Sequence, residues 1–91
     1  MVSKRQLKIE ACVCFFDMES WEVKSRVLAA LDNAMEKSGC GRLAGAGTSL
    51  CDEGTYTVEF LVRDQGRCQD IVAECCAGLG LDDYEVNFYE L

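Results

Sequence analysis

Two kinds of hydrophobic spacing divide the chain into six expected elements. Residues 6–16 and 55–63 alternate between apolar and polar positions, and this period of two predicts β-strands. Residues 84–91 repeat the alternation, and the glycine-rich residues 42–50 are compatible with a strand that forms a hairpin with 55–63. Between these segments, apolar residues recur every three or four positions in two stretches, which predicts two helices.

Capping residues predict where the helices begin and end. Asp17 is the expected N-cap of the first helix, and Gly39 is expected to end it after about five turns. Asp64 and Gly80 are expected to have the same two roles in the second helix. The residues at 51–56, CDEGTY, are expected to form the hairpin turn.

The first helix is predicted to have one apolar and one charged side. Its apolar stripe includes Val27, Leu31 and Met35, whereas Lys24 is expected on the solvent side. Trp21 lies early in the helix and is interpreted as an anchor near the edge of the core.

The element order β-α-β-β-α-β predicts an α+β sandwich in a single domain spanning residues 1–91. It resembles the ferredoxin-like superfold, a four-stranded antiparallel sheet with two helices on one face. The stretch GAGTSLCDEGTYTVEFLVRD, followed by a helix ending in GLGL, is similar to segments of small uncharacterised bacterial proteins. Neither resemblance brings a functional motif with it, and this superfold supports many unrelated functions.

Alternation also predicts the two faces of the sheet. The residues expected to meet the helices are Leu7, Ile9, Ala11, Val13, Val58, Phe60, Val62, Val86 and Phe88. The opposite face is left open in a single copy, and its expected residues are Cys12, Cys14, Phe16, Thr57, Glu59, Leu61, Arg63, Asn87, Tyr89 and Leu91.

The cysteines are the main source of candidate chemistry. Cys12 and Cys14 should lie side by side on the open face, about 7 Å apart. Structural zinc sites usually have four ligands from two short clusters such as CxxC. The sequence has no CxxC and no histidine, and no four cysteines converge in the expected fold. Packing is therefore expected for these thiols, with no metal and no cofactor.

A catalytic role for a cysteine is also not expected. A cysteine nucleophile needs a base and a lowered pKa, and the chain has no histidine to serve as that base. Cys68, in the first turns of the second helix, is the best remaining candidate for a reactive thiol. The chain is therefore predicted not to be an enzyme.

The net charge of the chain argues against some classes of binding partner. The formal net charge of −7 argues against nucleic acid and against anionic membrane surfaces. No apolar run approaches the roughly 20 residues needed to span a bilayer. Glu10 interrupts the apolar part of the N-terminal stretch, which argues against a signal peptide. The odd number of seven cysteines favours a reducing, cytoplasmic location over a disulfide scaffold.

These observations favour a small acidic protein–protein interaction domain. The open face is expected to have an apolar centre and a charged rim of Glu10, Glu59, Arg63 and Glu85, which is typical of an interface. A homodimer formed through the open face or an edge strand, or another protein partner, is expected, with an inhibitor or immunity protein as the heterotypic version. The predicted partner-binding residues are Cys12, Cys14, Phe16, Glu59, Leu61, Arg63, Tyr89 and Leu91. The alternative is an effector-binding regulatory domain, with a small molecule held between the glycines of residues 42–50 and a helix.

Overall fold

A computed structural model describes residues 8–18, 20–48 and 55–90. It confirms the predicted order of strands and helices. The elements are β1 (Ile9–Phe15), α1 (Trp21–Ser38), β2 (Gly41–Thr48), β3 (Tyr56–Val62), α2 (Gln65–Leu79) and β4 (Tyr84–Glu90). The predicted hairpin turn at 51–56 and the predicted site residue Leu91 fall wholly or partly outside the described residues.

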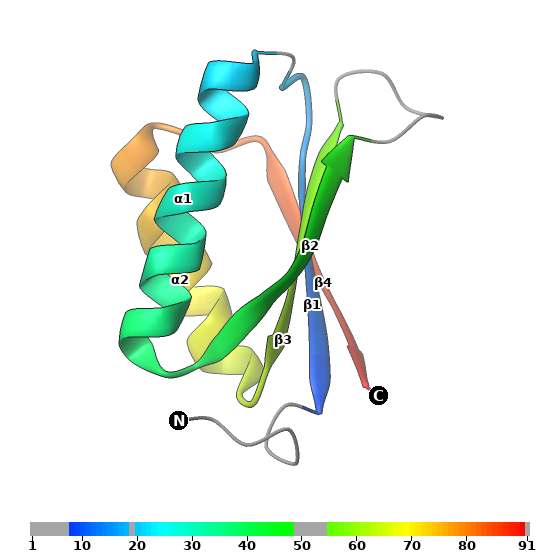
Figure 1. Cartoon of the computed structure of the whole chain (residues 1–91). Coiled ribbons are helices and arrows are strands. Elements are labelled where there is room, and N and C mark those ends of the chain that lie inside the picture. Colours follow the sequence, from blue (N-terminus) through cyan, green and yellow to red (C-terminus); the bar gives the residue numbers. More distant parts are fainter. Residues whose placement is uncertain (1–7, 19, 49–54, 91) are drawn as a thin grey trace.

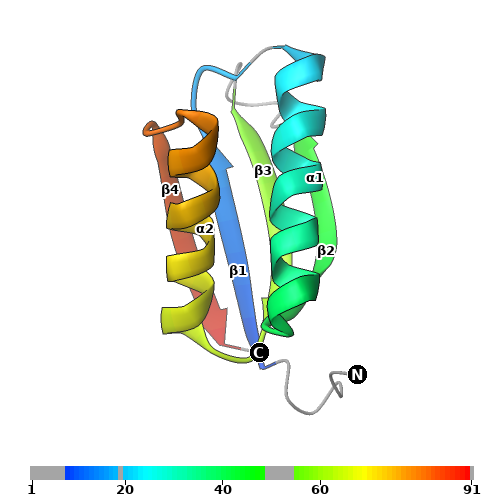
Figure 2. The same ribbon diagram turned by 90° about the vertical axis from the view of Figure 1, so that its left-hand side faces the viewer.

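The four strands form one antiparallel sheet in the order β2-β3-β1-β4. In the middle of β1, Val13 lies between Val58 of β3 and Val86 of β4. Both helices cover the same face of the sheet and run side by side across it (Figures 1 and 2). This is the ferredoxin-like arrangement, and it places β2 and β4 at the two edges of the sheet.

The core lies between the helices and the sheet. Burial alternates along β1 and β3, and the predicted inward residues of these strands, such as Ala11 and Phe60, are fully buried apart from the half-buried Ile9. Val86 and Phe88 of β4 are half-buried against the same core. Leu7, also predicted to face the helices, lies outside the described residues. The largest fully buried side chains are Phe15, Phe60, Leu31 and Met35.

The prediction that Asp17 caps the first helix is wrong. The N-cap of α1 is Ser20, whose hydroxyl oxygen accepts a hydrogen bond from the backbone N–H of Val23 at 3.4 Å. Asp17 instead has a positive φ of 54° in the bend after β1, a conformation that aspartate tolerates better than most residues. The connection needs this bend because Met18, which follows it, packs into the core before the helix starts.

The predictions for Lys24 and Trp21 are also wrong. Lys24 is only 5% exposed, and Trp21 is 73% exposed. The Lys24 ammonium lies 4.7 Å from the centre of the Trp21 ring and 5.8 Å from that of Tyr56. Sequence periodicity counts a lysine as polar, whereas its four-carbon stem can be buried while aromatic faces contact the charged end.

The other predicted helix ends are confirmed. Gly39 and Gly80 both adopt left-handed conformations after α1 and α2. Asp64 caps α2, with its carboxylate accepting a hydrogen bond from the backbone N–H of Arg67 at 3.0 Å.

The face of the sheet opposite the helices is left uncovered by the described elements. Figure 1 shows the sheet almost edge-on, with α1 and α2 together on one side of it. Among the described residues, no helix combines the length and the apolar character that crossing a membrane requires.

Candidate functional site

The open face consists of three rows of side chains that run across the strands. Strand register defines these rows, which are listed from the β2 edge to the β4 edge. The first contains Arg42, Leu61, Glu10 and Tyr89; the second, Gly45, Glu59, Cys12 and Asn87; the third, Gly47, Thr57, Cys14 and Glu85.

Most of the predicted partner-binding residues come together on this face. Cys12, Cys14, Glu59 and Leu61 are half-buried in its central strands. Tyr89, on the edge strand β4, is 55% exposed. These positions agree with the faces that alternation predicted.

The two predicted residues at strand ends lie differently. Phe16 follows the end of β1 and is 39% exposed. Arg63 follows β3, and its guanidinium lies beside Gly39, with Nη2 3.6 Å from where a β-carbon on that glycine would be. Arg63 is therefore directed toward the end of α1 and is not brought to the centre of the open face.

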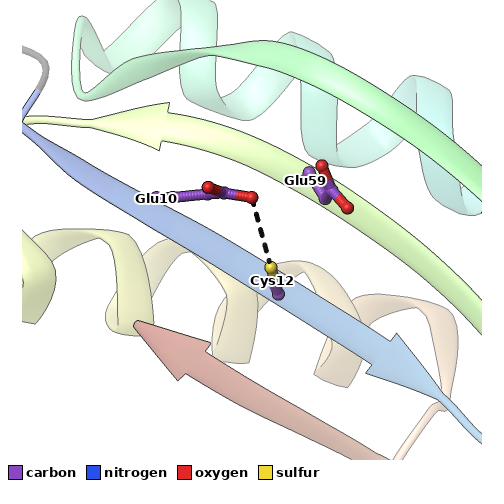
Figure 3. A group of neighbouring side chains, drawn as sticks. All are labelled: Glu10, Cys12 and Glu59. Carbon is purple, nitrogen blue, oxygen red and sulfur yellow. Dashed lines mark hydrogen bonds between the residues drawn. The ribbon is translucent and has the colours of Figure 1, made fainter. Parts of the chain in front are cut away.

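The centre of the open face is more polar than the sequence predicted. Glu59 was expected at the rim, but it lies directly opposite Cys12 in the middle row. The Cys12 thiol donates a hydrogen bond to Oε1 of Glu10 at 3.7 Å. The sulfur of Cys12 and one carboxylate oxygen each from Glu10 and Glu59 lie within 4.8 Å of one another. Figure 3 shows Glu10 extending from β1 toward this thiol and Glu59 projecting from β3.

The surroundings of Cys12 keep its thiol protonated. Burial raises the pKa of Cys12, and the negative charges of Glu10 and Glu59 raise it further, to about 11. A thiol with this pKa carries almost no thiolate at neutral pH, so it is a poor nucleophile. Its neighbour Cys14 accepts a hydrogen bond from the Thr57 hydroxyl at 3.7 Å.

Cysteines on the other side of the sheet belong to the core. Cys68, the best sequence candidate for a reactive thiol, is fully buried, and burial raises its pKa to about 12. Burial also raises the pKa of Cys76 to about 11. Cys40 and Cys75 donate hydrogen bonds to the carbonyl oxygens of Asp64 and Ala30. These thiols fill space between the layers, in the way the sequence predicted for packing cysteines.

Two depressions lie on the described surface, near the end of α2 and near the start of α1. One, of about 480 Å³, is lined by Ala73, Ala77, Gly80, Leu81, Asp82 and Tyr84. It lies where the end of α2 leads into β4, whereas the predicted effector site involved the glycines of β2. A smaller depression of about 150 Å³ lies beside Phe16 and the start of α1.

Sequence reasoning missed the grouping of Glu10, Cys12 and Glu59. Alternation alone indicated that Glu10 and Cys12 share a face, since they are two residues apart in one strand. The approach of Glu59 depends on the register between β1 and β3, which are separated in the sequence by α1 and β2. A thiol between two carboxylates also does not match the cysteine and histidine clusters that are typical of zinc sites.

Comparisons with known proteins support the fold. No protein-family model matches the chain, and no curated protein matches it. Among solved structures, it is similar to a conserved protein from Methanosarcina mazei Go1, with a TM-score of 0.54 and 18% sequence identity. The similarity covers 94% of this chain and 95% of that protein. At this level of identity the likeness shows a shared fold and nothing about activity.

Proposed function

We propose that the protein is a non-enzymatic interaction domain that forms a homodimer through the open face of its sheet. The observation that supports this most is the uncovered face itself, which combines the half-buried Leu61 and Cys14 with the exposed ring of Tyr89. Protein interfaces combine apolar and polar side chains, and tyrosine is enriched in them. The cytoplasmic location predicted from the cysteines remains part of this proposal.

The charges at the two ends of the open face are complementary between two copies, whereas Glu59 in the middle row would face its own counterpart and oppose association. Lys8 and Arg42 lie toward the end of the face where β1 begins, and Glu85 lies toward the opposite end, next to the exposed Asp82 and Asp83. Two copies can stack face to face around a two-fold axis that lies parallel to the sheet and perpendicular to the strands. This axis reverses the strand direction, so the basic end of each copy lies at the same end as the acidic end of the other.

The same arrangement is sterically suited to the outer strands. With the axis through the middle row, Arg42 of one copy lies over Gly47 of the other, where the absence of a side chain leaves room for the guanidinium. Tyr89 of one copy lies over Glu85 of the other, so that the phenol can donate a hydrogen bond to the carboxylate. Both pairs occur twice in the dimer because the interface is isologous.

The size of the open face sets the surface area that a dimer could bury. Four strands of about seven residues form a sheet of about 19 by 24 Å. Covering it completely would bury an area toward the lower end of the range for specific interfaces, about 600–800 Å² per chain. Buried area alone does not fix affinity, so dimerisation is to be measured over a series of protein concentrations up to the millimolar range.

Two exposed side chains on the face provide the test. Arg42→Glu reverses the charge at the basic end, and Tyr89→Asp removes the aromatic ring and adds a negative charge. Each is expected to weaken dimerisation by about tenfold or more, measured by light scattering during size-exclusion chromatography. Arg26→Glu makes the same charge change on the exposed surface of α1 and should leave dimerisation within about threefold of the parent.

Circular dichroism of each variant establishes that the fold is kept. The proposal is wrong if the parent chain stays monomeric at millimolar concentration, or if Arg26→Glu disrupts the dimer as strongly as Arg42→Glu. A monomer that captures a basic protein instead would indicate the heterotypic, inhibitor-like version predicted from the sequence.

The alternative of an effector-binding domain has a different signature. Its most suitable location is the depression lined by Ala73 and Tyr84 between α2 and β4. A bound metabolite would raise the melting temperature according to its concentration and affinity, so a thermal-shift screen distinguishes the two functions.

A further inference from the structure

Three different donor atoms meet at the centre of the open face. Cys12 supplies a sulfur, and Glu10 and Glu59 each supply a carboxylate oxygen, all within 4.8 Å of one another. Two neighbouring strands hold them, because Cys12 and Glu59 are directly paired across β1 and β3 and Glu10 is two residues before Cys12. Positions on paired strands are better fixed than positions on loops, so the donors are held close together by the sheet.

The spacing is close to what a tetrahedral metal centre needs. With metal–sulfur and metal–oxygen bonds of about 2.3 and 2.0 Å, two ligands of a tetrahedral zinc ion lie about 3.5 Å apart. The Cys12 sulfur and Glu10 Oε1 are already 3.7 Å apart. The other distances between the three donor atoms are no longer than 4.8 Å. Side-chain rotation that moves the Glu10 and Glu59 carboxylate oxygens by about 1 Å would complete the tetrahedral geometry.

The donor set selects the kind of metal. Magnesium and calcium prefer oxygen ligands alone, and copper(I) prefers sulfur ligands. One thiolate with two carboxylates suits a borderline divalent ion, of which zinc is the clearest example. The three side chains are half-buried on a face open to solvent, so water can take the fourth position.

Local electrostatics favour a cation at the same point. The negative charges of Glu10 and Glu59 both act on the Cys12 sulfur. In the described part of the chain, neither carboxylate forms an ion pair with a basic side chain. A divalent cation between the three donors would offset the repulsion that a Cys12 thiolate would otherwise experience there.

We propose that Glu10, Cys12 and Glu59 form a binding site for one zinc ion per chain. This departs from the sequence-based expectation of no metal, which did not combine a thiol with carboxylates as ligands. Binding replaces the S–H bond of Cys12 with a sulfur–zinc bond and releases the proton to solvent, while the two carboxylates replace water on the ion. The ligands come from a single chain, so the site can form in the monomer, whereas the proposed dimer would cover it and place the two copies' sites over one another.

The zinc site can be tested by titrating cobalt(II) and then zinc(II) into the reduced full-length chain, after a chelator has removed any bound metal. Cobalt should give the near-ultraviolet charge-transfer absorption of a thiolate–cobalt bond, at one equivalent per chain, and zinc should abolish it by displacement. Calorimetry in buffers of different ionisation enthalpy should show about one proton released per zinc bound. Apparent affinity should rise about tenfold per pH unit between pH 6 and 8, because the thiol must lose a proton.

Matched variants distinguish this site from the other thiols. Cys12→Ser should abolish the thiolate band, whereas Cys14→Ser, two residues along the same face, should keep it. Glu10→Gln and Glu59→Gln should each weaken zinc binding by about tenfold or more while preserving shape and charge distribution elsewhere. Arg42→Glu, aimed at the dimer, should bind zinc normally, so that failure of the dimer proposal can be told apart from failure of this one.

Three results would overturn the zinc site. They are binding well below one equivalent per chain, a thiolate band that survives Cys12→Ser, and equal zinc affinity in the parent and in both glutamine variants. Circular dichroism of each variant without metal separates a lost ligand from a lost fold.

Discussion

The start of β2 offers a sharp test of the sheet geometry, through the change Gly41→Ala. Gly41 is buried and pairs with Val62 at the end of β3. A β-carbon on Gly41 would lie 2.8 Å from Cγ1 of Val62 and 2.9 Å from its Cα, and would overlap the carbonyl oxygen of Leu61. Two of these three atoms belong to the backbone, so the clash cannot be relieved by rotating a side chain.

The expected cost follows from this rigidity. Adding a methyl group to a tightly packed site typically costs 1–3 kcal/mol, and contact with backbone places Gly41→Ala near the upper end, at about 3 kcal/mol. In a domain of this size, 1 kcal/mol corresponds to about 4–8 °C in melting temperature, so the variant should melt about 15 °C below the parent. Thermal and urea unfolding, followed by circular dichroism at equal protein concentrations, measure both quantities.

Two other glycines of the same strand are matched controls. A β-carbon on Gly45 or on Gly47 would meet no atom within 4 Å. Gly45→Ala and Gly47→Ala should therefore change the free energy of unfolding by no more than about 0.5 kcal/mol. If Gly41→Ala is as stable as these two variants, the close approach of β2 to β3 at this point is refuted.

Two further predictions concern a helix end and a thiol. Asp64→Ala should destabilise the protein by about 1 kcal/mol in urea unfolding, and Ser20→Ala by less, because the Asp64 cap bond is the shorter, at 3.0 Å against 3.4 Å; equal losses would contradict this. The pKa of Cys12 is raised from the ordinary thiol value of 9.0 to about 11, so the rate of alkylation of this thiol should rise with pH up to about pH 11. Mass spectrometry of the peptide that contains Cys12 measures this rate. Because the unfolded chain loses this proton first, the contribution of Cys12 to stability is present below pH 9 and lost as pH rises through 11; alkylation that levels off near pH 9 would contradict the raised pKa.

Much of the fold could be predicted because local patterns and tertiary packing agree. Alternation identified the inward residues of β1 and β3, since each strand has one face against the helices. Gly39, Asp64 and Gly80 were recognised because each satisfies a local requirement of a helix end. The start of α1 was misplaced because Asp17 and Ser20 are both good capping residues, and the position of Met18 in the core decides between them.

The composition of the open face depended on information that local patterns do not contain. Alternation predicts which residues lie on the open face, but the register between β1 and β3 determines which of them are neighbours across the strands. That register places Glu59 beside Cys12 and so replaces the predicted apolar centre with a thiol between carboxylates. Arg63 shows the same limit, because its side chain continues past the strand end toward Gly39.

The most direct test of the central claim is to ask which face a second copy contacts. Isotope-filtered NMR on an equal mixture of ¹³C-labelled and unlabelled chain detects only contacts between copies. We predict intermolecular contacts from Leu61 and Tyr89, with none from the exposed surfaces of α1 and α2. A concentrated sample without intermolecular contacts, or with contacts confined to the helices, would contradict it.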